Sequence, residues 1–360
     1  MSIHFHPLTI SDIRAETSHC ISIAFAVPDE LKEQFQFREG QSLTLRSFIN
    51  GEEVRRSYSI CSSPLEKEWR IAVKLIPNGK FSSFAHTILK KGDQLEVLPP
   101  TGKFYTPLNP AAKKEYVAFA AGSGITPILS IIKTVLATEP DSGFTLIYGN
   151  RNRASIIFRE QLEALKNQYM NRFRLIHILS REKTDAPIHT GRIDAEKCEA
   201  LGNGLLNWNQ INSYFLCGPE DMIFTVRNFL QSKGVSPASI HFELFASPGQ
   251  KATPGPGQDT AAANAGPMAA VTLKVDGRSI ELTVPYEGTA ILDAALQAGA
   301  DLPYACKGGV CATCRAKLVE GEVTMDTNYA LEPEEVRAGF ILTCQSHPRT
   351  PNLLIDFDQK

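Results

Sequence analysis

Four cysteines in the C-terminal part of the chain limit its possible folds more than any other feature. Cys306, Cys311 and Cys314 have the spacing Cys-x4-Cys-x2-Cys, and a fourth, Cys344, follows at a distance. This is the spacing of thiolates that hold a [2Fe-2S] cluster. Two glycines in the first gap keep the loop small and leave backbone N–H groups free to point at sulfur. The sequence therefore predicts a loop that wraps an iron-sulfur cluster, a carrier of single electrons.

Other arrangements of the same cysteines are a four-cysteine zinc site, a disulfide between Cys311 and Cys314, and plain buried thiols. Zinc loops more often contain two Cys-x2-4-Cys pairs, so the spacing favours iron and sulfide. The remaining cysteines lack ligand spacing, and we expect most of them to be small core residues: Cys20, Cys61, Cys198 and Cys217.

Composition indicates an ordinary globular protein. The chain has 360 residues, 43% of them hydrophobic and 21% charged, a length that predicts two or three domains. A net charge of −2 argues against nucleic acid as a general partner. Lys133 interrupts the longest apolar run, residues 125–137, so we expect no membrane span. Residues 1–6 lack the pattern of a signal peptide, and a cytoplasmic location is expected.

A segment rich in Pro, Gly and Ala divides the chain. Residues 247–270 carry repeated helix breakers without apolar periodicity, which predicts a linker. Beyond it, residues 271–360 contain 13 acidic and 8 basic residues. Such an acidic domain is suited to docking on a basic face, although an ordinary solvated surface would have the same composition.

The residues before this linker show two different patterns. Residues 1–108 contain short alternating runs separated by turn signals, such as 69–76 and 94–98, which predict an antiparallel β-barrel. Residues 109–246 alternate buried strands with helical stretches, which predicts a doubly wound parallel α/β domain. The expected strands and the first helix of that domain are residues 116–121, 127–137, 144–148, 173–179 and 213–217.

In such an α/β domain, nucleotides bind where strands end and helices begin. The first turn of this kind contains Gly122, Gly124, Thr126 and Pro127, with the proline where the usual fingerprint has a third glycine. A second turn follows Cys217 and contains Gly218. Another strand ends in Ser180 and Arg181, which suit a 2′-phosphate and favour NADPH; a solvated arginine at a strand end is the alternative.

Two short segments of the predicted barrel have residues suited to binding a flavin. The first provides a guanidinium, an aromatic ring and hydroxyls, and consists of Arg56, Ser57, Tyr58 and Ser59. The second is a glycine turn with serines at a helix start, and consists of Gly79, Ser82 and Ser83. We also expect the strand end at Val73 and Lys74 to contact the cofactor. Taken alone, each string would suit the edge of any β-barrel.

Together these motifs resemble the ferredoxin-NADP reductase superfamily with a C-terminal plant-type ferredoxin. The resemblance covers nearly the whole chain apart from the linker. It implies an FAD-binding barrel at 1–108, an NAD(P)-binding α/β domain at 109–246, and a ferredoxin domain of β-grasp fold at 271–360. It also implies that the catalytic residues beside the flavin are Ser59, Cys217, Glu243 and Phe245, with Phe245 also in contact with the cofactors.

The function implied by this resemblance is electron transfer from NADPH through FAD and the [2Fe-2S] cluster to an oxygenase. The strings at 302–311 and 325–331 are most similar to reductase subunits of phenylacetyl-CoA 1,2-epoxidases, which implies a role in phenylacetate catabolism. Related reductases serve steroid and aromatic hydroxylases and remain alternatives. A non-enzymatic protein that senses redox state or binds zinc through the cysteine loop is the alternative of a different class.

Overall fold

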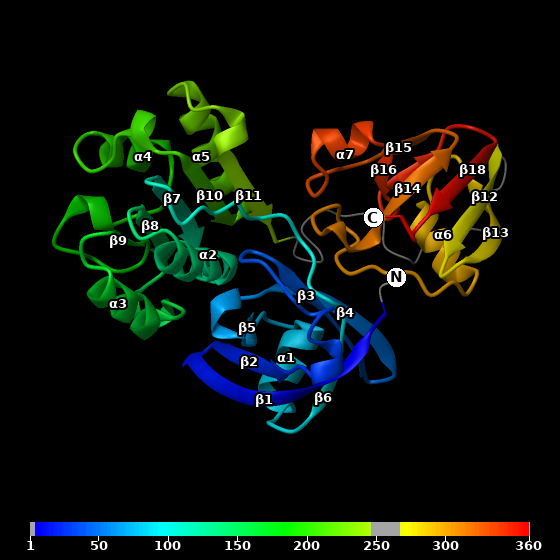
Figure 1. Ribbon diagram of the computed structural model, residues 1–360, viewed down its shortest axis with the longest axis horizontal. Coiled ribbons are helices and arrows are strands. Elements are labelled where there is room, and N and C mark those ends of the chain that lie inside the picture. The colour runs from blue at the N-terminus through cyan, green and yellow to red at the C-terminus, as the bar shows by residue number, and fades with distance from the viewer. Residues whose placement is uncertain (1–3, 246–266, 360) are drawn as a thin grey trace. The chain divides into compact units, whose positions relative to one another are not determined.

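The computed structural model describes residues 4–245 and 267–359 (Figure 1). These residues form two compact units. The larger consists of His6–Val54 and Tyr58–Phe245, and the smaller contains the C-terminal part of the chain. Most of the linker expected at 247–270 lies outside the described residues, but its end does not, because a strand already begins at Met268.

The N-terminal sheet of the larger unit is an antiparallel barrel, as predicted. Its strand order is β4-β3-β6-β1-β2-β5, and a bridge between Ile60 and Ile71 joins the two ends of the sheet. Alternate residues of β1, such as Leu8 and Ile10, are fully buried and help to form the barrel core. The elements are β1 (His6–Thr17), β2 (Cys20–Ala26), β3 (Ser42–Ile49), β4 (Glu52–Ser59), β5 (Trp69–Lys74), α1 (Lys80–Thr87) and β6 (Gln94–Val97).

The second sheet is wholly parallel and has the order β11-β10-β7-β8-β9. The order reverses between β7 and β10, so this pair is the point where a doubly wound sheet binds its ligand. The buried-strand runs predicted from the sequence all form strands: the run at 173–179 coincides with β9, and the other three strands are one to three residues longer than predicted. The elements are β7 (Glu115–Ala121), α2 (Ile125–Thr138), β8 (Gly143–Asn150), α3 (Arg159–Gln168), β9 (Phe173–Leu179), α4 (Ala195–Gly202), β10 (Ser213–Gly218), α5 (Glu220–Ser232) and β11 (Ile240–Leu244).

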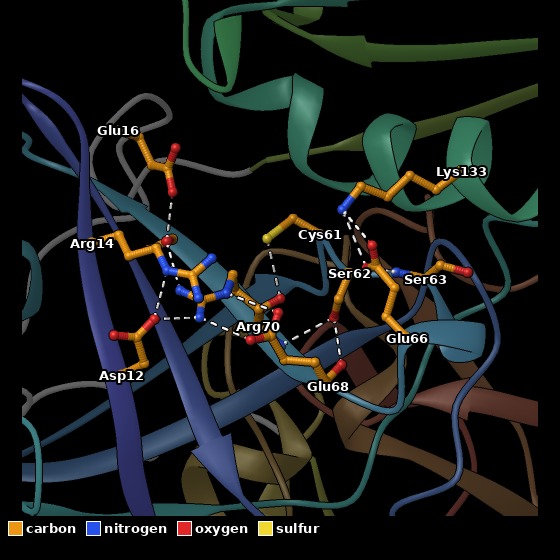
Figure 2. Close-up of polar contacts among 11 residues, drawn as sticks. Asp12, Arg14, Glu16, Cys61, Ser62, Ser63, Glu66, Glu68, Arg70 and Lys133 are labelled. Carbon is orange, nitrogen blue, oxygen red and sulfur yellow. Dashed lines mark hydrogen bonds and ion pairs between the residues drawn. The ribbon is translucent and has the colours of Figure 1, made fainter. Parts of the chain in front are cut away.

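Hydrogen bonds and an ion pair join α2 to the barrel segment that follows β4, and Figure 2 shows the ion pair between Lys133 and Glu66. Ser130 Oγ donates to the Ser62 carbonyl at 2.6 Å, and Thr134 Oγ1 lies 2.9 Å from Ser63 Oγ. Lys133 Nζ pairs with the Glu66 carboxylate at 3.0 Å. Both serine–helix contacts are buried, so they fix the helix on the barrel without competition from water.

A buried arginine organises the barrel strands beside this joint (Figure 2). Arg70 on β5 is 3% exposed and donates to Asp12 Oδ2 at 2.7 Å and to Ser22 Oγ at 2.9 Å. It also forms a two-pronged ion pair with Glu68. Arg70 therefore holds together β1, β2 and β5, and its hydrogen bonds lower the pKa of Asp12 and of Glu68.

The C-terminal part of the chain is a small α+β domain, as predicted. Its main sheet has the order β13-β12-β18-β14-β16, in which β12 and β18 are parallel and the other pairs are antiparallel. A two-stranded sheet of β15 and β17 completes it. The elements are β12 (Met268–Val275), β13 (Arg278–Pro285), α6 (Ile291–Gln297), β14 (Arg315–Glu320), β15 (Val323–Met325), α7 (Pro333–Arg337), β16 (Phe340–Leu342), β17 (Ser346–Pro348) and β18 (Asn352–Asp356).

Candidate functional site

Two predicted catalytic residues from distant parts of the chain meet in the larger unit. Ser59 ends β4 of the barrel, and Glu243 lies on β11 of the parallel sheet. The Ser59 hydroxyl donates a 3.0 Å hydrogen bond to Glu243 Oε2. Burial raises the pKa of Glu243 to about 7, and the hydrogen bond from Ser59 opposes that shift. The pair can therefore hold or release a proton near neutral pH.

Two aromatic side chains, Tyr58 and Phe245, were predicted to contact the flavin. The Tyr58 ring lies 5.5 Å from the Phe81 ring on α1, so the barrel core supports it. Phe245 is 39% exposed and directly follows β11. An exposed ring so close to Glu243 in the chain is available to cover a flat cofactor. Of the other residues in the string, Arg56 and Ser57 lie on β4 with partly exposed side chains.

The remaining predicted flavin contacts differ in accessibility. Val73 is fully buried and offers only its backbone, because its side chain belongs to the barrel core. At the start of α1, Gly79 is the N-cap residue, and Ser83 follows with a partly exposed side chain. Ser82 is buried, and its hydroxyl accepts a hydrogen bond from the Ile76 N–H and donates to the Gly79 carbonyl. Ser82 thus shapes the turn rather than presenting a free hydroxyl.

The two predicted glycine turns meet at the reversal point of the parallel sheet. A Cβ atom on Gly124 would lie 2.1 Å from the Cys217 carbonyl oxygen, so only glycine allows this approach. Gly122 has a φ of +55°, and its carbonyl accepts from the Tyr148 hydroxyl. Thr126 Oγ1 donates to the Ser123 carbonyl and so tightens the turn before α2. Close backbone approach at the start of a helix is the arrangement that receives a pyrophosphate.

Two other residues of these turns are placed by packing. Pro127 lies in the first turn of α2 with its ring buried, where its missing N–H leaves no hydrogen bond unmade. A Cβ on Gly218 would lie 2.8 Å from Met222 Cε and 3.1 Å from Ala121 Cβ, so the second turn also leaves no room for a side chain.

Cys217, predicted as catalytic, has a fully buried side chain in the hydrophobic core. Burial and the neighbouring Glu243 carboxyl raise the pKa of its thiol well above the ordinary value. A neutral thiol in the core is a poor nucleophile, so any effect on catalysis must pass through its neighbours.

The basic side chain of Lys74 lies beside the first nucleotide turn. Lys74 Nζ lies 3.2 Å from the position that a Cβ on Gly122 would occupy. Its pKa is lowered by burial first and then by the charge of Arg151, which follows β8. The Arg151 carbonyl accepts from the Arg181 N–H, and the Ser180 N–H donates to the Asn150 carbonyl. Arg151 was not among the predicted site residues, although its place directly after a strand of the parallel sheet could have indicated it.

The four predicted cluster ligands lie in the smaller unit as two pairs. The thiols of Cys306 and Cys311 share one hydrogen bond, and those of Cys314 and Cys344 share another. The Gly308 N–H points at Cys306 Sγ at 3.3 Å, and the Cys306 N–H points at Cys311 Sγ at 3.4 Å. Backbone donors directed at sulfur are the surroundings that a thiolate-bound cluster requires.

The four cysteines suit a cluster of two irons. A [2Fe-2S] cluster takes two thiolates at each iron, and the pairs Cys306–Cys311 and Cys314–Cys344 would provide them. Within residues 4–245 and 267–359, no group of three or more His, Cys, Asp or Glu side chains is placed to hold a single metal ion.

In the part of the chain that the structure describes, no helix combines the length and apolar character needed to cross a membrane. Lys133, which interrupts the longest apolar run of the sequence, lies in α2.

Family models match three successive parts of the chain. An oxidoreductase FAD-binding domain matches residues 7–105, and an oxidoreductase NAD-binding domain matches residues 119–228. A 2Fe-2S iron-sulfur cluster binding domain matches residues 273–349. The chain therefore has domains for FAD, for a nicotinamide nucleotide and for the cluster, in the order predicted.

Curated relatives align over the full length. The chain is 45% identical to a component of the 1,2-phenylacetyl-CoA epoxidase of Escherichia coli K12, over 99% of this chain and 98% of that protein. It is 37% identical to the ferredoxin reductase component of 3-ketosteroid-9-alpha-monooxygenase from Rhodococcus rhodochrous, over 97% and 96% of the two chains. The solved phthalate dioxygenase reductase shares its fold with a TM-score of 0.56 and 24% identity, over 98% of each chain. The chain belongs to the ferredoxin-NADP reductase superfamily, among the reductase components of oxygenases that end in a [2Fe-2S] ferredoxin domain.

Proposed function

We propose that this reductase delivers electrons from NADPH to an oxygenase that epoxidises phenylacetyl-CoA. The observation that carries this choice of acceptor is the 45% identity, over the full length, to a component of such an epoxidase. Identity to the 3-ketosteroid monooxygenase reductase is lower, at 37%. Partner choice in such systems depends on surface complementarity, and shared sequence along the whole chain favours a shared partner.

In the proposed function, the two electrons of a hydride leave the protein one at a time. A bound flavin would accept the hydride, and a [2Fe-2S] cluster would carry the electrons onward singly. The protein supplies position and proton control. Tyr58 and Phe245 provide faces for the flat ring, and the glycine turns at Gly122 and Gly124 admit the dinucleotide. Ser59 and Glu243 place a proton-holding pair at the junction of the barrel and the parallel sheet.

The preference for NADPH over NADH is supported by positive charge. Arg181 and Arg151 follow neighbouring parallel strands and are joined through their backbones. Lys74 adds a third cationic group, whose pKa is lowered by burial first and then by the charge of Arg151. Both nucleotides carry a pyrophosphate, but only NADPH carries a 2′-phosphate, which would give these cations a further negative group to bind.

Cys306, Cys311, Cys314 and Cys344 are the proposed cluster ligands. The two hydrogen-bonded thiol pairs and the backbone donors at sulfur support this assignment. The cytoplasm is the proposed location, and the proposed partner is the oxygenase component itself, with neither nucleic acid nor a membrane involved.

Reconstitution with candidate oxygenases tests the choice of partner. The purified reductase is mixed in turn with a phenylacetyl-CoA epoxidase, a 3-ketosteroid hydroxylase and an aromatic dioxygenase, and substrate-dependent NADPH oxidation is followed. We expect coupled turnover with the epoxidase at a rate at least about tenfold above the others. Equal or faster turnover with another oxygenase would refute the phenylacetyl-CoA assignment and leave the reductase chemistry intact.

A further inference from the structure

Gln345, the residue after the fourth predicted ligand, joins three segments of the cluster-binding region. Its Nε2 donates to the Lys307 carbonyl at 2.9 Å, in the loop that carries the first ligands. Its Oε1 accepts from the Thr327 hydroxyl at 2.7 Å, in the segment after β15. The residue itself belongs to the third segment, and its own carbonyl accepts from the Asp326 N–H.

The same side chain also reaches a ligand sulfur. Gln345 Nε2 lies 3.7 Å from Cys344 Sγ, within hydrogen-bond range for sulfur, and 2.9 Å from the Cys344 carbonyl. The orientation of the amide is fixed by its partners, because only the NH2 group can face two carbonyls and a thiolate while the oxygen accepts from a hydroxyl.

The surroundings leave this amide little freedom. Gly309 has a φ of +73°, and a Cβ there would lie 2.8 Å from Thr327 Oγ1 and 3.2 Å from Gln345 Cγ. The glycine thus lets the ligand loop pack directly against the glutamine and its threonine partner. A side chain held on three sides cannot turn away from the sulfur without losing its other hydrogen bonds.

We propose that Gln345 is a positioning residue that sets the reduction potential of the cluster, by clamping its loops and donating a hydrogen bond to Cys344 Sγ. This inference rests on the proposed ligation by the four cysteines. Reduction adds negative charge to the cluster and its sulfurs, so an N–H donor at sulfur stabilises the reduced form more than the oxidised form. Gln345 therefore raises the potential and makes the cluster easier to reduce.

The test is potentiometry of the full-length protein, with the cluster followed by its EPR signal. Gln345→Leu keeps most of the side chain's bulk and removes its donors. We expect its reduced-to-oxidised ratio to fall about tenfold at a given ambient potential, a shift of about −59 mV for one electron. Gln345→Glu replaces the donor by a negative charge and should shift the potential further in the same direction. Gln297→Leu, an exposed glutamine at the end of α6, is the matched control and should leave the potential unchanged.

Resonance Raman spectroscopy supplies a readout that a purely structural role would not change. In the wild type, the Fe–S stretching bands should shift when the protein is exchanged into D2O, and Gln345→Leu should lose part of that shift. An assembled cluster in Gln345→Leu with the wild-type potential and the wild-type deuterium shift would overturn the inference.

A second variant decides the matter if Gln345→Leu does not retain its cluster. Thr327→Val leaves the glutamine in place but removes the hydroxyl that donates to its Oε1, and should lower the potential below that of the wild type. Thr327→Ser keeps the hydroxyl and should behave as the wild type. A wild-type potential in Thr327→Val would contradict the clamp. Absence of a cluster from the wild-type protein would instead refute the proposed ligation.

Discussion

Glu243 provides the clearest test at the scale of a single residue. Its carboxyl changes from neutral to charged within a pH range in which stability and activity are easily measured. Its pKa is raised from an ordinary value of 4.5 to about 7. The folded protein therefore holds a proton that the unfolded chain releases, and the stability due to this group is lost as the pH rises from about 4.5 to about 7. The family resemblance singled out this residue but not the shift, which comes from burial and is opposed by the hydrogen bond from Ser59.

We expect Glu243→Gln to remove this pH dependence. The free energy of unfolding of the variant, relative to the wild type, should increase between pH 4.5 and 7 and then level off, measured by urea titration of flavin-replete protein. Flavin reduction by NADPH in stopped flow should be at least about tenfold slower, since the proton-holding pair is gone. A constant difference in stability across this range would contradict the raised pKa.

Arg181 tests the nucleotide preference. We expect Arg181→Ala to raise the KM for NADPH about tenfold or more while the KM for NADH hardly changes, because only NADPH carries a 2′-phosphate. Arg174→Ala, on the same strand, is the control: its guanidinium donates to the Leu205 carbonyl and lies before the strand end. An equal rise for both nucleotides would exclude a 2′-phosphate contact.

Gly124, in the first nucleotide turn, provides another test at the level of a single residue. Gly124→Ala places a methyl group against the Cys217 carbonyl, so the two turns must separate. We expect at least about a tenfold loss of NADPH affinity by fluorescence titration, with the cluster retained in the visible spectrum. Gly204→Ala is the control, because a Cβ there meets nothing within 4 Å. Unchanged affinity in Gly124→Ala would show that the close approach is not needed for nucleotide binding.

At the scale of elements, the joint between α2 and the barrel holds the two halves of the larger unit in register. Thr134→Val leaves the buried Ser63 hydroxyl without its 2.9 Å partner. The Ser63 oxygen still accepts from the Leu65 N–H, but its hydroxyl hydrogen loses its acceptor. Such a buried donor without an acceptor costs about 1–3 kcal/mol, measurable as a lower urea midpoint. Thr138→Val, at the last and partly exposed position of α2, should cost less than about 0.5 kcal/mol. Similar effects of the two variants would argue against a specific joint.

For the whole molecule, the order of the domains could be predicted because each pattern behind it is local. Strands such as β9 follow from short buried runs, and the cysteine spacing identifies the cluster loop without any tertiary information. The approach of Lys74 to Gly122 was beyond such reasoning, since it depends on how a barrel strand meets a turn of another domain. The burial of Cys217 and the clamp by Gln345 likewise depend on contacts among segments far apart in the chain.

Electron flow through both cofactors is tested by anaerobic titration of the purified protein with NADPH, with absorbance and EPR recorded at each addition and Cys306→Ser run in parallel. We expect NADPH to bleach both flavin and cluster bands and to produce the EPR signal of a reduced [2Fe-2S] cluster. Cys306→Ser should lack that signal and still reduce ferricyanide with NADPH, because its flavin and nucleotide sites are intact. A colourless wild-type protein, or bleaching of the flavin without any cluster signal, would contradict this path of electrons.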